Sequence, residues 1–312
     1  IVPAFSIMVG TRVGVGKVAV NVVDMSTSQD IISLIDIDER AWSKDFLCKF
    51  IQAKEKYLNS QARGATIKGI KIDVLAELKL PDISLEEQQY ISQVIDTIKN
   101  IIAVRQDELQ KLDELIKARF VEMFGNENNS KHWDVVNIED VANVQVGVVI
   151  KPSQYYTDDY SGIKAFRSLN IGEGYIKNSD WVCFTKDGNQ KNSKSILKEN
   201  DVLVVRSGAP GIACVVSKKY EGYNAIDIII ARPDLRKVNP YYLCTYTNMP
   251  HGRKQINEGI GGAAQQHFNV GKYNKVQLML PPMGLQEDFM TFVTQVDKSK
   301  FPKNFRLEQM HV

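Results

Sequence analysis

Residues 14–17 have the residue types of a phosphate-binding loop. The segment Gly14-Val15-Gly16-Lys17 matches the end of such a loop, in which glycine amides and a lysine surround the phosphates of a nucleotide. The hydroxyl that would bind magnesium is missing, because Val18 follows where Ser or Thr is required. Thr11 also stands where the loop needs its leading glycine. We therefore expect a strand-turn-strand corner here and no nucleotide site.

Other segments with catalytic residue types are also incomplete. Asn239-Pro240-Tyr241-Tyr242 lacks the second proline of the amino-methyltransferase active-site motif, and a helix start with proline in its first turn explains it better. Glu77-Leu78-Lys79 lacks the upstream Pro-Asp pair of a nuclease site, and Asp158-Asp159 lies in a Tyr-rich loop typical of a solvated turn. There is no nucleophile elbow, no clear carboxylate dyad and no metal-ligand spacing among the four histidines. We expect no catalytic centre and no metal site.

Two stretches of the chain repeat the same order of segments. Residues 6–95 and 200–296 each contain a hydrophobic segment ending in an Arg/Gly turn, a central Asp-Ile-Ile, a glycine-rich polar stretch and a hydrophobic segment leading into a helix. A repeat of this length is too long for a solenoid and indicates two copies of one domain. Two diverged copies suit a protein that reads two different targets. The aligned positions include Arg12 with Arg206 and Asp30 with Asp227.

A long helix is predicted between the copies, over residues 84–125. Ser84 followed by Glu87 is a capping box, Gly125 is a natural stop, and neither Pro nor Gly lies between them. At 1.5 Å per residue the helix should be roughly 60 Å long. Its hydrophobic residues recur every seven positions, which predicts a coiled-coil-type spacer that needs a partner helix. A long core helix is the alternative. The repeating positions are Ile95, Ile102, Leu109, Ile116 and Met123, with Ile91, Ile98 and Leu112 in the alternate position.

Four segments follow from these features. Residues 126–284 combine short β-like runs with helix starts near Pro240 and Gly284, and they should form a complete mixed domain. Residues 1–83 show the second half of the same plan, and residues 285–312 begin a second long helix. Because the chain opens inside the repeat unit and ends soon after this helix begins, we expect a sequence that is incomplete at both ends. The β-like runs are Val144–Ile150, Val202–Val205, Ile212–Val216, Ala225–Ala231 and Val276–Leu280.

The composition is that of an ordinary soluble globular protein of about two domains. The 312 residues are 44% hydrophobic and 24% charged, with a net charge of +2. Such a charge neither requires nor excludes nucleic acid, since the clustering of charge matters more than its total. No run approaches the ~20 apolar residues that span a bilayer. The four cysteines form no CxxC pair, so we expect a reducing, cytoplasmic location.

Ordered phrases in both copies resemble the specificity subunit of a type I restriction–modification system. The second copy carries DVLVVRSGAPGIACVV, AIDIII, VNPYYLCTY, AQQHFNV and VQLMLPPMGLQEDF. The first copy ends with LKLPDISLEEQQYI and runs into a helix that finishes LIKARFVEMFG, and GIKAFRSLNIGEGYI resembles an early recognition-domain segment. Each phrase is short, but their order, repeated around a long helix, covers nearly the whole chain.

The resemblance implies two α/β target recognition domains held apart by two long antiparallel helices. In this family each domain reads one half of a split DNA sequence. The helices set the gap between the halves and bind two modification (methyltransferase) subunits, through which restriction subunits join. The specificity subunit has no catalytic centre, so S-adenosylmethionine, ATP and magnesium would belong to the partner subunits. The incomplete first domain and the short second helix depart from the family pattern, and helix 84–124 could pair with another copy of the chain.

Sequence reading needs side chains that reach base edges, with Arg suited to guanine and Asn or Gln to adenine. Phosphate contacts from Lys, Arg or Ser position the protein. Arg167 and Arg206 could instead support turns, an alternative that the recurrence of Arg in both copies keeps open. Residues 265–267 differ from residues 67–69 of the first copy and are better specificity candidates, with an ordinary polar loop as the alternative. The candidate DNA-binding residues are Lys151, Ser153, Gln154, Arg167, Asn170, Arg206, Ser207, Gln265, Gln266, His267, Arg12 and Lys68.

Two other functions stay open beside a non-catalytic DNA-recognition subunit. The chain could be the recognition region of a fused restriction–methylation enzyme, whose NPPY-type and cofactor motifs would lie outside this sequence. It could also be a scaffold or decoy that binds modification subunits through its helix without reading DNA.

Overall fold

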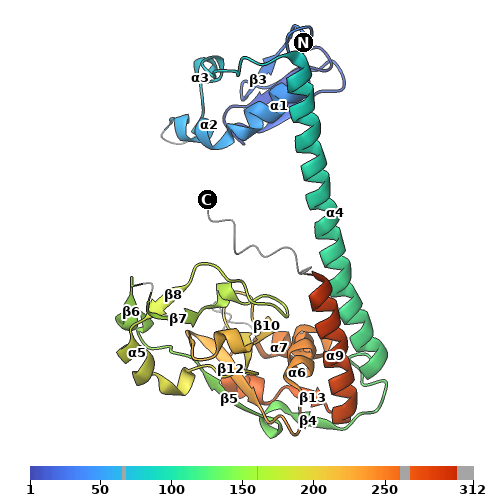
Figure 1. The fold of residues 1–312 in the computed structure, drawn as a ribbon, viewed down its shortest axis with the longest axis vertical. Helices are drawn as coiled ribbons and strands as arrows, with labels where there is room; N and C mark the ends of the chain where they lie inside the picture. The colour runs from blue at the N-terminus through green and yellow to red at the C-terminus, as the bar shows by residue number, and fades with distance from the viewer. Residues whose placement is uncertain (65–67, 160, 261–267, 301–312) are drawn as a thin grey trace. The chain divides into compact units, whose positions relative to one another are not determined.

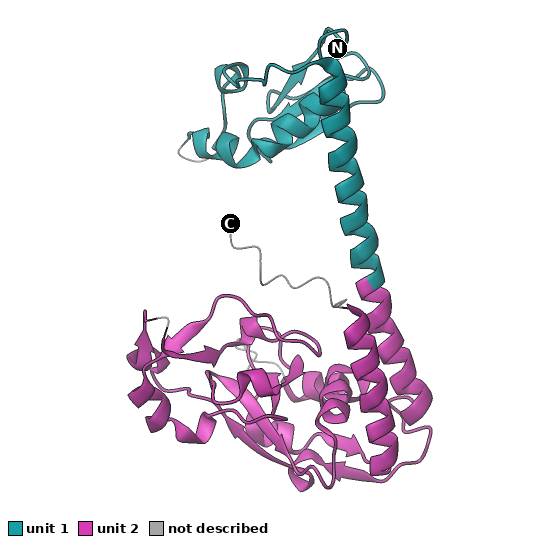
Figure 2. Cartoon of the chain, viewed as in Figure 1, with its two compact units in different colours: residues 1–108 teal, residues 109–312 magenta. Residues whose placement is uncertain are grey.

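The structure is a computed structural model that describes residues 1–64, 68–159, 161–260 and 268–300. The chain forms two compact units, Ile1–Glu108 (unit 1) and Leu109–Val312 (unit 2). Helix α4 (Leu85–Phe124) contributes to both of them (Figures 1 and 2). The domain boundaries expected at either end of this helix stay predictions, because the division between the units falls within it.

Unit 1 is a small sheet packed with short helices. Its described residues form three antiparallel strands in the order β2-β1-β3, and the side chains of the central strand alternate between buried and half-buried. The core joins Ile7 and Val9 of β1 to Leu47, Ile51 and Leu58 of the helices. The elements are β1 (Ile7–Gly10), β2 (Val18–Val20), β3 (Ile31–Leu34), α1 (Lys44–Ala53), α2 (Glu55–Gln61) and α3 (Ile72–Ala76).

The described residues of unit 2 form two four-stranded sheets and one two-stranded sheet. The strand orders are β10-β9-β12-β5, β11-β7-β8-β6 and β13-β4. The strands are β4 (Val135–Asn137), β5 (Ala142–Val146), β6 (Tyr156–Thr157), β7 (Ile163–Phe166), β8 (Val182–Phe184), β9 (Val202–Val205), β10 (Ala213–Val215), β11 (Asn224–Ala225), β12 (Ile228–Pro233) and β13 (Gln277–Met279). The helices are α5 (Lys186–Lys191), α6 (Pro240–Asn248), α7 (Pro250–Ile260), α8 (Val270–Asn274) and α9 (Met283–Lys300).

The sheet β10-β9-β12-β5 has a hydrophobic core on each face. Along β9, Val202 and Val204 pack with the helices of unit 2, whereas Leu203 and Val205 pack with an aromatic cluster around Phe166. Successive side chains of a strand point to opposite faces. A strand that is covered on both faces therefore appears in the sequence as an unbroken hydrophobic run. The run VLVV predicted this strand, and its bounds are confirmed.

The duplication predicted from the sequence is confirmed by the order of the elements. The series β1, β2, β3, α1, α2, α3, α4 of the first copy corresponds to β9, β10, β12, α6, α7, α8, α9 of the second, in which the two-residue strand β11 is inserted before β12. In both copies the first strand of the series lies between the other two and is antiparallel to each. The copies differ at one edge. Strand β12 also pairs with β5, whereas β3 has no second partner strand among the described residues.

A buried glutamine fixes the start of the last helix in each copy. Gln88 on α4 and Gln286 on α9 are both fully buried. The Gln286 side chain accepts a hydrogen bond from the backbone of Asn239 (2.8 Å) and donates one to the carbonyl of Pro281 (2.8 Å). The Gln88 side chain accepts from the backbone of Ser43 (2.9 Å) and donates to Ile83 (3.3 Å). Gln88 therefore joins α4 to the N-terminus of α1, and Gln286 joins α9 to the N-terminus of α6.

Replacing Gln286 with leucine should lower the free energy of unfolding of unit 2 by about 2–3 kcal/mol, because one buried N–H and one buried carbonyl would lose their partners. The measurement is urea unfolding followed by tryptophan fluorescence in a Trp42→Phe background, where Trp133 and Trp181 of unit 2 supply the signal. The same substitution at the exposed Gln295 of α9 is the control and should have little effect. Equal effects at the two positions would contradict the assigned role of Gln286.

Helix α4 begins and ends as predicted. The backbone of Ser84 donates to the Glu87 carboxylate (2.8 Å), and the backbone of Glu87 donates to the Ser84 hydroxyl (3.2 Å), which completes the capping box. Gly125 follows the helix with a positive φ of 89°, a conformation that glycine adopts without strain. His251 of α7 is hydrogen-bonded to the Gly125 carbonyl (3.1 Å), and burial lowers the pKa of this imidazole.

The seven-residue pattern describes only part of this helix. Between Tyr90 and Val104 most of its hydrophobic side chains are exposed, which argues against a core helix over this stretch. Its C-terminal third belongs to the core of unit 2, where Phe120 and Phe124 are fully buried. These two residues lie outside the predicted heptad positions. The heptad positions Ile116 and Met123 are only partly buried against the same core.

Candidate nucleic-acid interface

Lys151, Ser153 and Gln154 are exposed on the loop between β5 and β6. Strand β5 ends earlier than predicted, at Val146, because Gly147 passes so close to β11 that a Cβ atom there would lie 2.3 Å from the carbonyl oxygen of Ala225. The chain then turns outward. Lys151 has a left-handed backbone (φ 43°), and the 3-10 turn Pro152–Tyr155 follows it. The lysine side chain is therefore presented to solvent at the start of a compact turn.

The polar residues expected to face DNA after β7 contact the protein instead. Asn170 is fully buried. Its side chain accepts from the backbone of Arg167 (2.9 Å) and donates to the carbonyl of Ser179 (2.7 Å), so it supports the 3-10 turn Ser168–Asn170. The guanidinium of Arg167 donates to the carbonyl of Asp180. The prediction that Asn170 faces DNA is therefore wrong, and Arg167 has a turn-supporting contact of the kind the sequence left open.

Arg206 and Arg12 both form ion pairs with the duplicated aspartate. Arg206 lies 2.9 Å from Asp227, and Arg12 lies 3.3 Å from Asp30. The alignment of the two arginines is off by one residue, however. The amide of Phe268 donates to the carbonyl of Arg206, whereas the amide of the corresponding Ile70 donates to the carbonyl of Thr11. Arg206 therefore corresponds to Thr11, one residue before Arg12. The ion pair holds each turn against the start of a strand. It is thus a shared structural feature of both copies.

Backbone hydrogen bonds bring the candidate loops of unit 2 to one edge. The amide of Val148 donates to Ala225 (2.7 Å), the amide of Ile226 donates to Phe166 (2.8 Å), and the amide of Asp227 donates to Val148 (3.1 Å). The loop with Lys151, the turn after Phe166 and the Arg206–Asp227 pair are therefore neighbours. The hydroxyl of Ser207 also donates to Asp227 (3.3 Å). Gln265, Gln266 and His267 lie outside the described residues.

In unit 1 the two candidates also come from adjacent segments. Lys68 is exposed, and the next residue, Gly69, is so close to Arg12 that a Cβ atom there would lie 2.7 Å from its Cγ. The glycine-rich stretch of the first copy thus packs against the Arg/Gly turn.

The sequence also led to expectations about Asp159, metal binding and membrane spans. Asp159 accepts hydrogen bonds from Ser161 (2.7 and 2.8 Å), and these bonds hold the pKa of its carboxyl below the ordinary value. Among the described residues, no group of three or more His, Cys, Asp or Glu side chains could hold a metal ion. No helix in the described ranges is long and apolar enough to cross a membrane.

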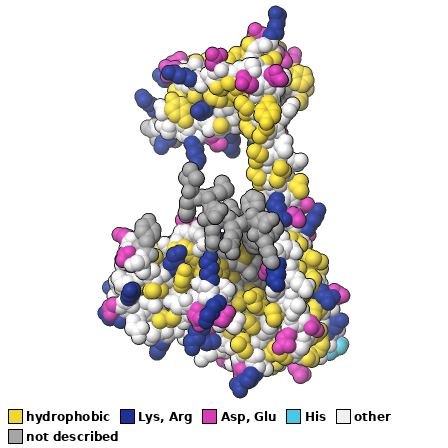
Figure 3. Space-filling view, viewed as in Figure 1, with side chains coloured by type: hydrophobic (Ala, Val, Ile, Leu, Met, Phe, Trp, Pro, Cys, Tyr) yellow, Lys and Arg dark blue, Asp and Glu magenta, His cyan; other side chains and the backbone are white. Residues whose placement is uncertain are grey.

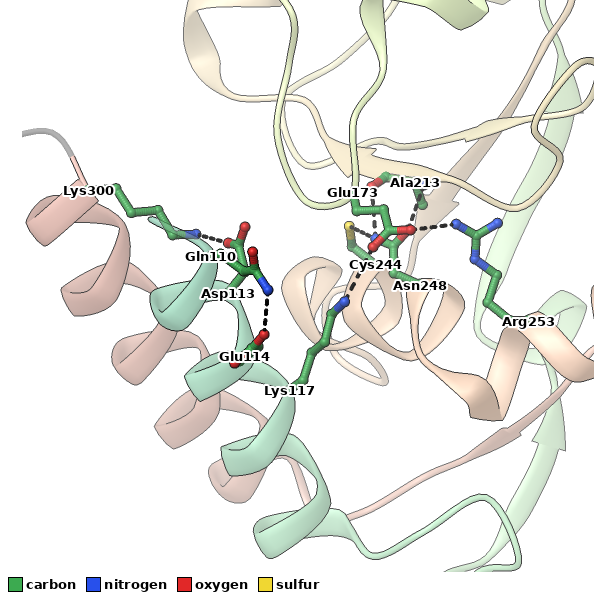
Figure 4. Close-up of polar contacts among 10 residues, drawn as sticks. All are labelled: Gln110, Asp113, Glu114, Lys117, Glu173, Ala213, Cys244, Asn248, Arg253 and Lys300. Atoms are coloured by element: carbon green, nitrogen blue, oxygen red, sulfur yellow. Dashed lines mark hydrogen bonds and ion pairs between the residues drawn. The ribbon is translucent and has the colours of Figure 1, made fainter. Parts of the chain in front are cut away.

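An ion-pair network that the sequence did not reveal lies beside these loops. The carboxylate of Glu173 forms ion pairs with Lys117 of α4 (3.5 Å) and Arg253 of α7 (3.0 Å), as Figure 4 shows. Nearby, the side chain of Asn248 binds both the N–H and the carbonyl of Ala213 at 2.9 Å. A cavity of about 340 Å³ lies between α4, α6, α9 and residues 172–177. No spacing in the sequence signalled this network, because its members come from distant segments.

Comparison with known proteins places the chain in a family. A family model described as "Type I restriction modification DNA specificity domain" matches residues 1–114 and 130–307. The two matched ranges contain the two copies of the repeat, and the interval between them covers the end of α4 and the turn that follows it.

Individual relatives agree with the family match. The chain is 23% identical over 287 residues to the type I restriction enzyme MjaVIII specificity subunit of Methanocaldococcus jannaschii, covering 85% of this chain and 66% of that protein. It is 18% identical to the EcoBI specificity subunit of Escherichia coli, covering 84% of this chain and 60% of the relative. The S subunit of M. genitalium shares the fold with a TM-score of 0.59 at 14% identity, over 96% of this chain and 78% of that one. The chain belongs to the type I restriction–modification DNA specificity domain family.

Proposed function

We propose that the chain is the DNA-recognition subunit of a type I restriction–modification complex. The observation that carries this proposal is the family match over both copies of the repeat. Each recognition domain would read one half of a split target, and helix α4 would act as the spacer. The chain would have no catalytic centre of its own. S-adenosylmethionine, ATP and magnesium would be bound by the modification and restriction subunits.

The edge of unit 2 that carries Lys151 is the proposed DNA-facing surface. Its lysine is exposed and unconstrained by an acidic neighbour in the described contacts, which suits a phosphate contact. Arg206 is paired with Asp227, and Arg12 of the first copy is paired with Asp30 in the same way. We therefore assign these ion pairs a turn-supporting role in both domains. Base reading would fall to residues that differ between the copies. Gln265, Gln266 and His267 stay the candidates for this role, and replacing Gln266 with alanine should alter the sequence preference.

Replacing Lys151 with alanine should weaken DNA binding on all sequences alike. Loss of one phosphate contact should reduce the slope of log affinity against log salt by about 1. The measurement is fluorescence anisotropy with duplex DNA at several potassium chloride concentrations, with the chain bound to its modification subunit. Arg236→Gln is the control, because Arg236 is 89% exposed just beyond the end of β12 farther from Asp227. A loss confined to one DNA sequence would contradict a phosphate role.

The exposed hydrophobic face of α4 is the proposed docking surface for modification subunits. Figure 3 shows hydrophobic side chains along this helix. Large exposed patches of this kind mark protein interaction sites. A second copy of the chain is the alternative occupant. The residues of the face are Tyr90, Ile91, Val94, Ile98, Ile101, Ile102 and Val104.

The double variant Ile98→Glu with Ile101→Glu should lose the modification subunit, because charged side chains would be buried at the interface. Both side chains are more than half exposed, so the chain itself should stay folded. Co-purification of the two subunits measures docking, and sedimentation of the chain alone measures self-association. Unchanged co-purification together with a dimer that dissociates in the variant would favour the second copy as the occupant.

A further inference from the structure

Arg253 joins two loops of unit 2 through a single guanidinium group. It lies on helix α7, and its side chain is only 22% exposed. One terminal nitrogen, Nη1, donates to the carbonyl of Pro210 (2.8 Å), and the other, Nη2, donates to the carboxylate of Glu173 (3.0 Å). Figure 4 shows Arg253 and Lys117 approaching Glu173 from different helices. Because the guanidinium is planar and rigid, it fixes the direction of both bonds at once.

One of the two loops carries the candidates Arg206 and Ser207, and the other follows the turn that begins at the candidate Arg167. Pro210 lies in the turn that begins with Arg206 and Ser207 and is closed by the amide of Gly211, which donates to the carbonyl of Val205 (2.8 Å). Glu173 lies in a hairpin, closed by the bridge between Ile171 and Ile176, that directly follows the turn Ser168–Asn170. The loops also touch through their backbones, since the amide of Gly174 donates to the carbonyl of Ala213 (2.9 Å). Arg253 thus adds the side-chain link between the two loops.

The first copy of the repeat supports one half of this link by another residue. There, Asn59 of α2 donates to the carbonyl of Val15 (2.9 Å), which occupies the place of Pro210. The next residue in each copy is a glycine with positive φ that packs on the same helix: a Cβ atom on Gly16 would lie 3.0 Å from Glu55, and one on Gly211 would lie 3.0 Å from Ile256. Support of this turn from the second helix therefore recurs with different chemistry. Among the described residues, the contact to a second loop occurs in the second copy alone.

We propose that Arg253 is a positioning residue for sequence recognition. It sets the Arg206–Gly211 turn and the Gly172–Tyr175 hairpin relative to each other, so that the edge formed by the Arg206–Asp227 pair and the turn after Phe166 keeps one shape against a DNA half-site. The inference rests on the proposed function of the chain as a DNA reader. Arg253 does not need to touch DNA for this role, because its two terminal nitrogens are engaged by protein and most of its side chain is buried. Recognition geometry generally has to be held within about 0.5 Å, which a supporting residue of this kind provides.

The variants Arg253→Gln and Arg253→Lys test the proposal, with Lys254→Gln on the exposed side of the same helix as the matched control. The full chain, bound to its modification subunit, is titrated with its selected duplex and with a scrambled duplex at several salt concentrations. We expect the ratio of the two affinities to fall about tenfold in the Arg253 variants, with an unchanged salt slope and little change in the melting temperature. Lys254→Gln should keep the ratio.

Each alternative outcome is distinct. An unchanged affinity ratio would overturn the proposal, and a salt slope reduced by about 1 on both duplexes would assign Arg253 to a phosphate contact instead. Parallel losses on both duplexes, together with a lower melting temperature, would show a structural role only. Glu173→Gln removes one arm of the link and should reduce the ratio less. Its effect should not add to that of Arg253→Gln, because the two residues share one interaction. If the unaltered chain bound both duplexes equally, the proposed function would fail and this inference with it.

Discussion

Replacing Phe120 with alanine is expected to lower the free energy of unfolding of unit 2 by about 3–5 kcal/mol, the usual cost of truncating a buried aromatic side chain. Phe120 is fully buried near the end of α4. Its ring lies 5.5 Å from that of Tyr242, 5.4 Å from Phe289 and 5.3 Å from His251, which come from three different helices. Its removal would therefore leave a cavity where four helices meet, with rings on several sides that cannot all move inward.

The measurement is urea unfolding in the Trp42→Phe background, in which unit 2 supplies the tryptophan signal. Val121→Ala is the matched control, because Val121 is the neighbouring residue on α4 and is 41% exposed. A loss of less than about 1 kcal/mol for Phe120→Ala would mean that the end of α4 is not part of this core. The result bears on function, because the same helix is the proposed spacer. Its rigid attachment to one recognition domain is what would allow it to set a distance.

The second large effect is expected at Arg232. Asp201 at the start of β9 is fully buried, and Arg232 of β12 donates to it through Nε (2.7 Å) and Nη2 (2.8 Å). The hydrogen bonds to the Asp201 carboxylate raise the pKa of the Arg232 guanidinium. Arg232→Met would leave a buried carboxylate whose one remaining partner among the described residues is the backbone amide of Lys198 (2.8 Å). We expect a loss of about 3–5 kcal/mol in the free energy of unfolding.

Arg236→Gln provides the comparison for this prediction. Arg236 also pairs with an aspartate, Asp234, at 2.9 Å, but it is 89% exposed. An exposed ion pair is screened by water and salt, so its removal should barely change stability. The two variants together test whether burial, and not the mere presence of an ion pair, decides the effect. If both variants behaved alike, the buried pair would not have the role that we assign to it.

The parts of the fold that could be predicted from the sequence are those governed by local chemistry. The capping box at Ser84, the stop at Gly125 and the buried run Val202–Val205 each depend on a few adjacent residues. The internal repeat then indicated that both copies share one order of elements. The sheet β11-β7-β8-β6 was largely missed, because its strands are two to four residues long and lie among polar turns. Strands this short depend on tertiary packing more than on their own sequence.

The candidate site was predictable only in outline. The recurrence of Arg12 and Arg206, each with an aspartate near the centre of its copy, contained the signal for the two ion pairs. Asn170 looked like a base reader because asparagine is suited to adenine, but its amide supports a turn, which is an equally common role for this residue. Arg253 and Glu173 could not be found from one sequence, because they are 80 residues apart and neither belongs to a recognisable motif.

Selection from a randomised duplex library tests the central claim most directly. The full chain, bound to its modification subunit, is incubated with the library, and the retained DNA is sequenced. We expect enrichment of at least one short motif, read by the recognition domain in unit 2. A stable complex with the modification subunit that enriches no sequence would contradict the account, because the chain would then bind its partner without reading DNA.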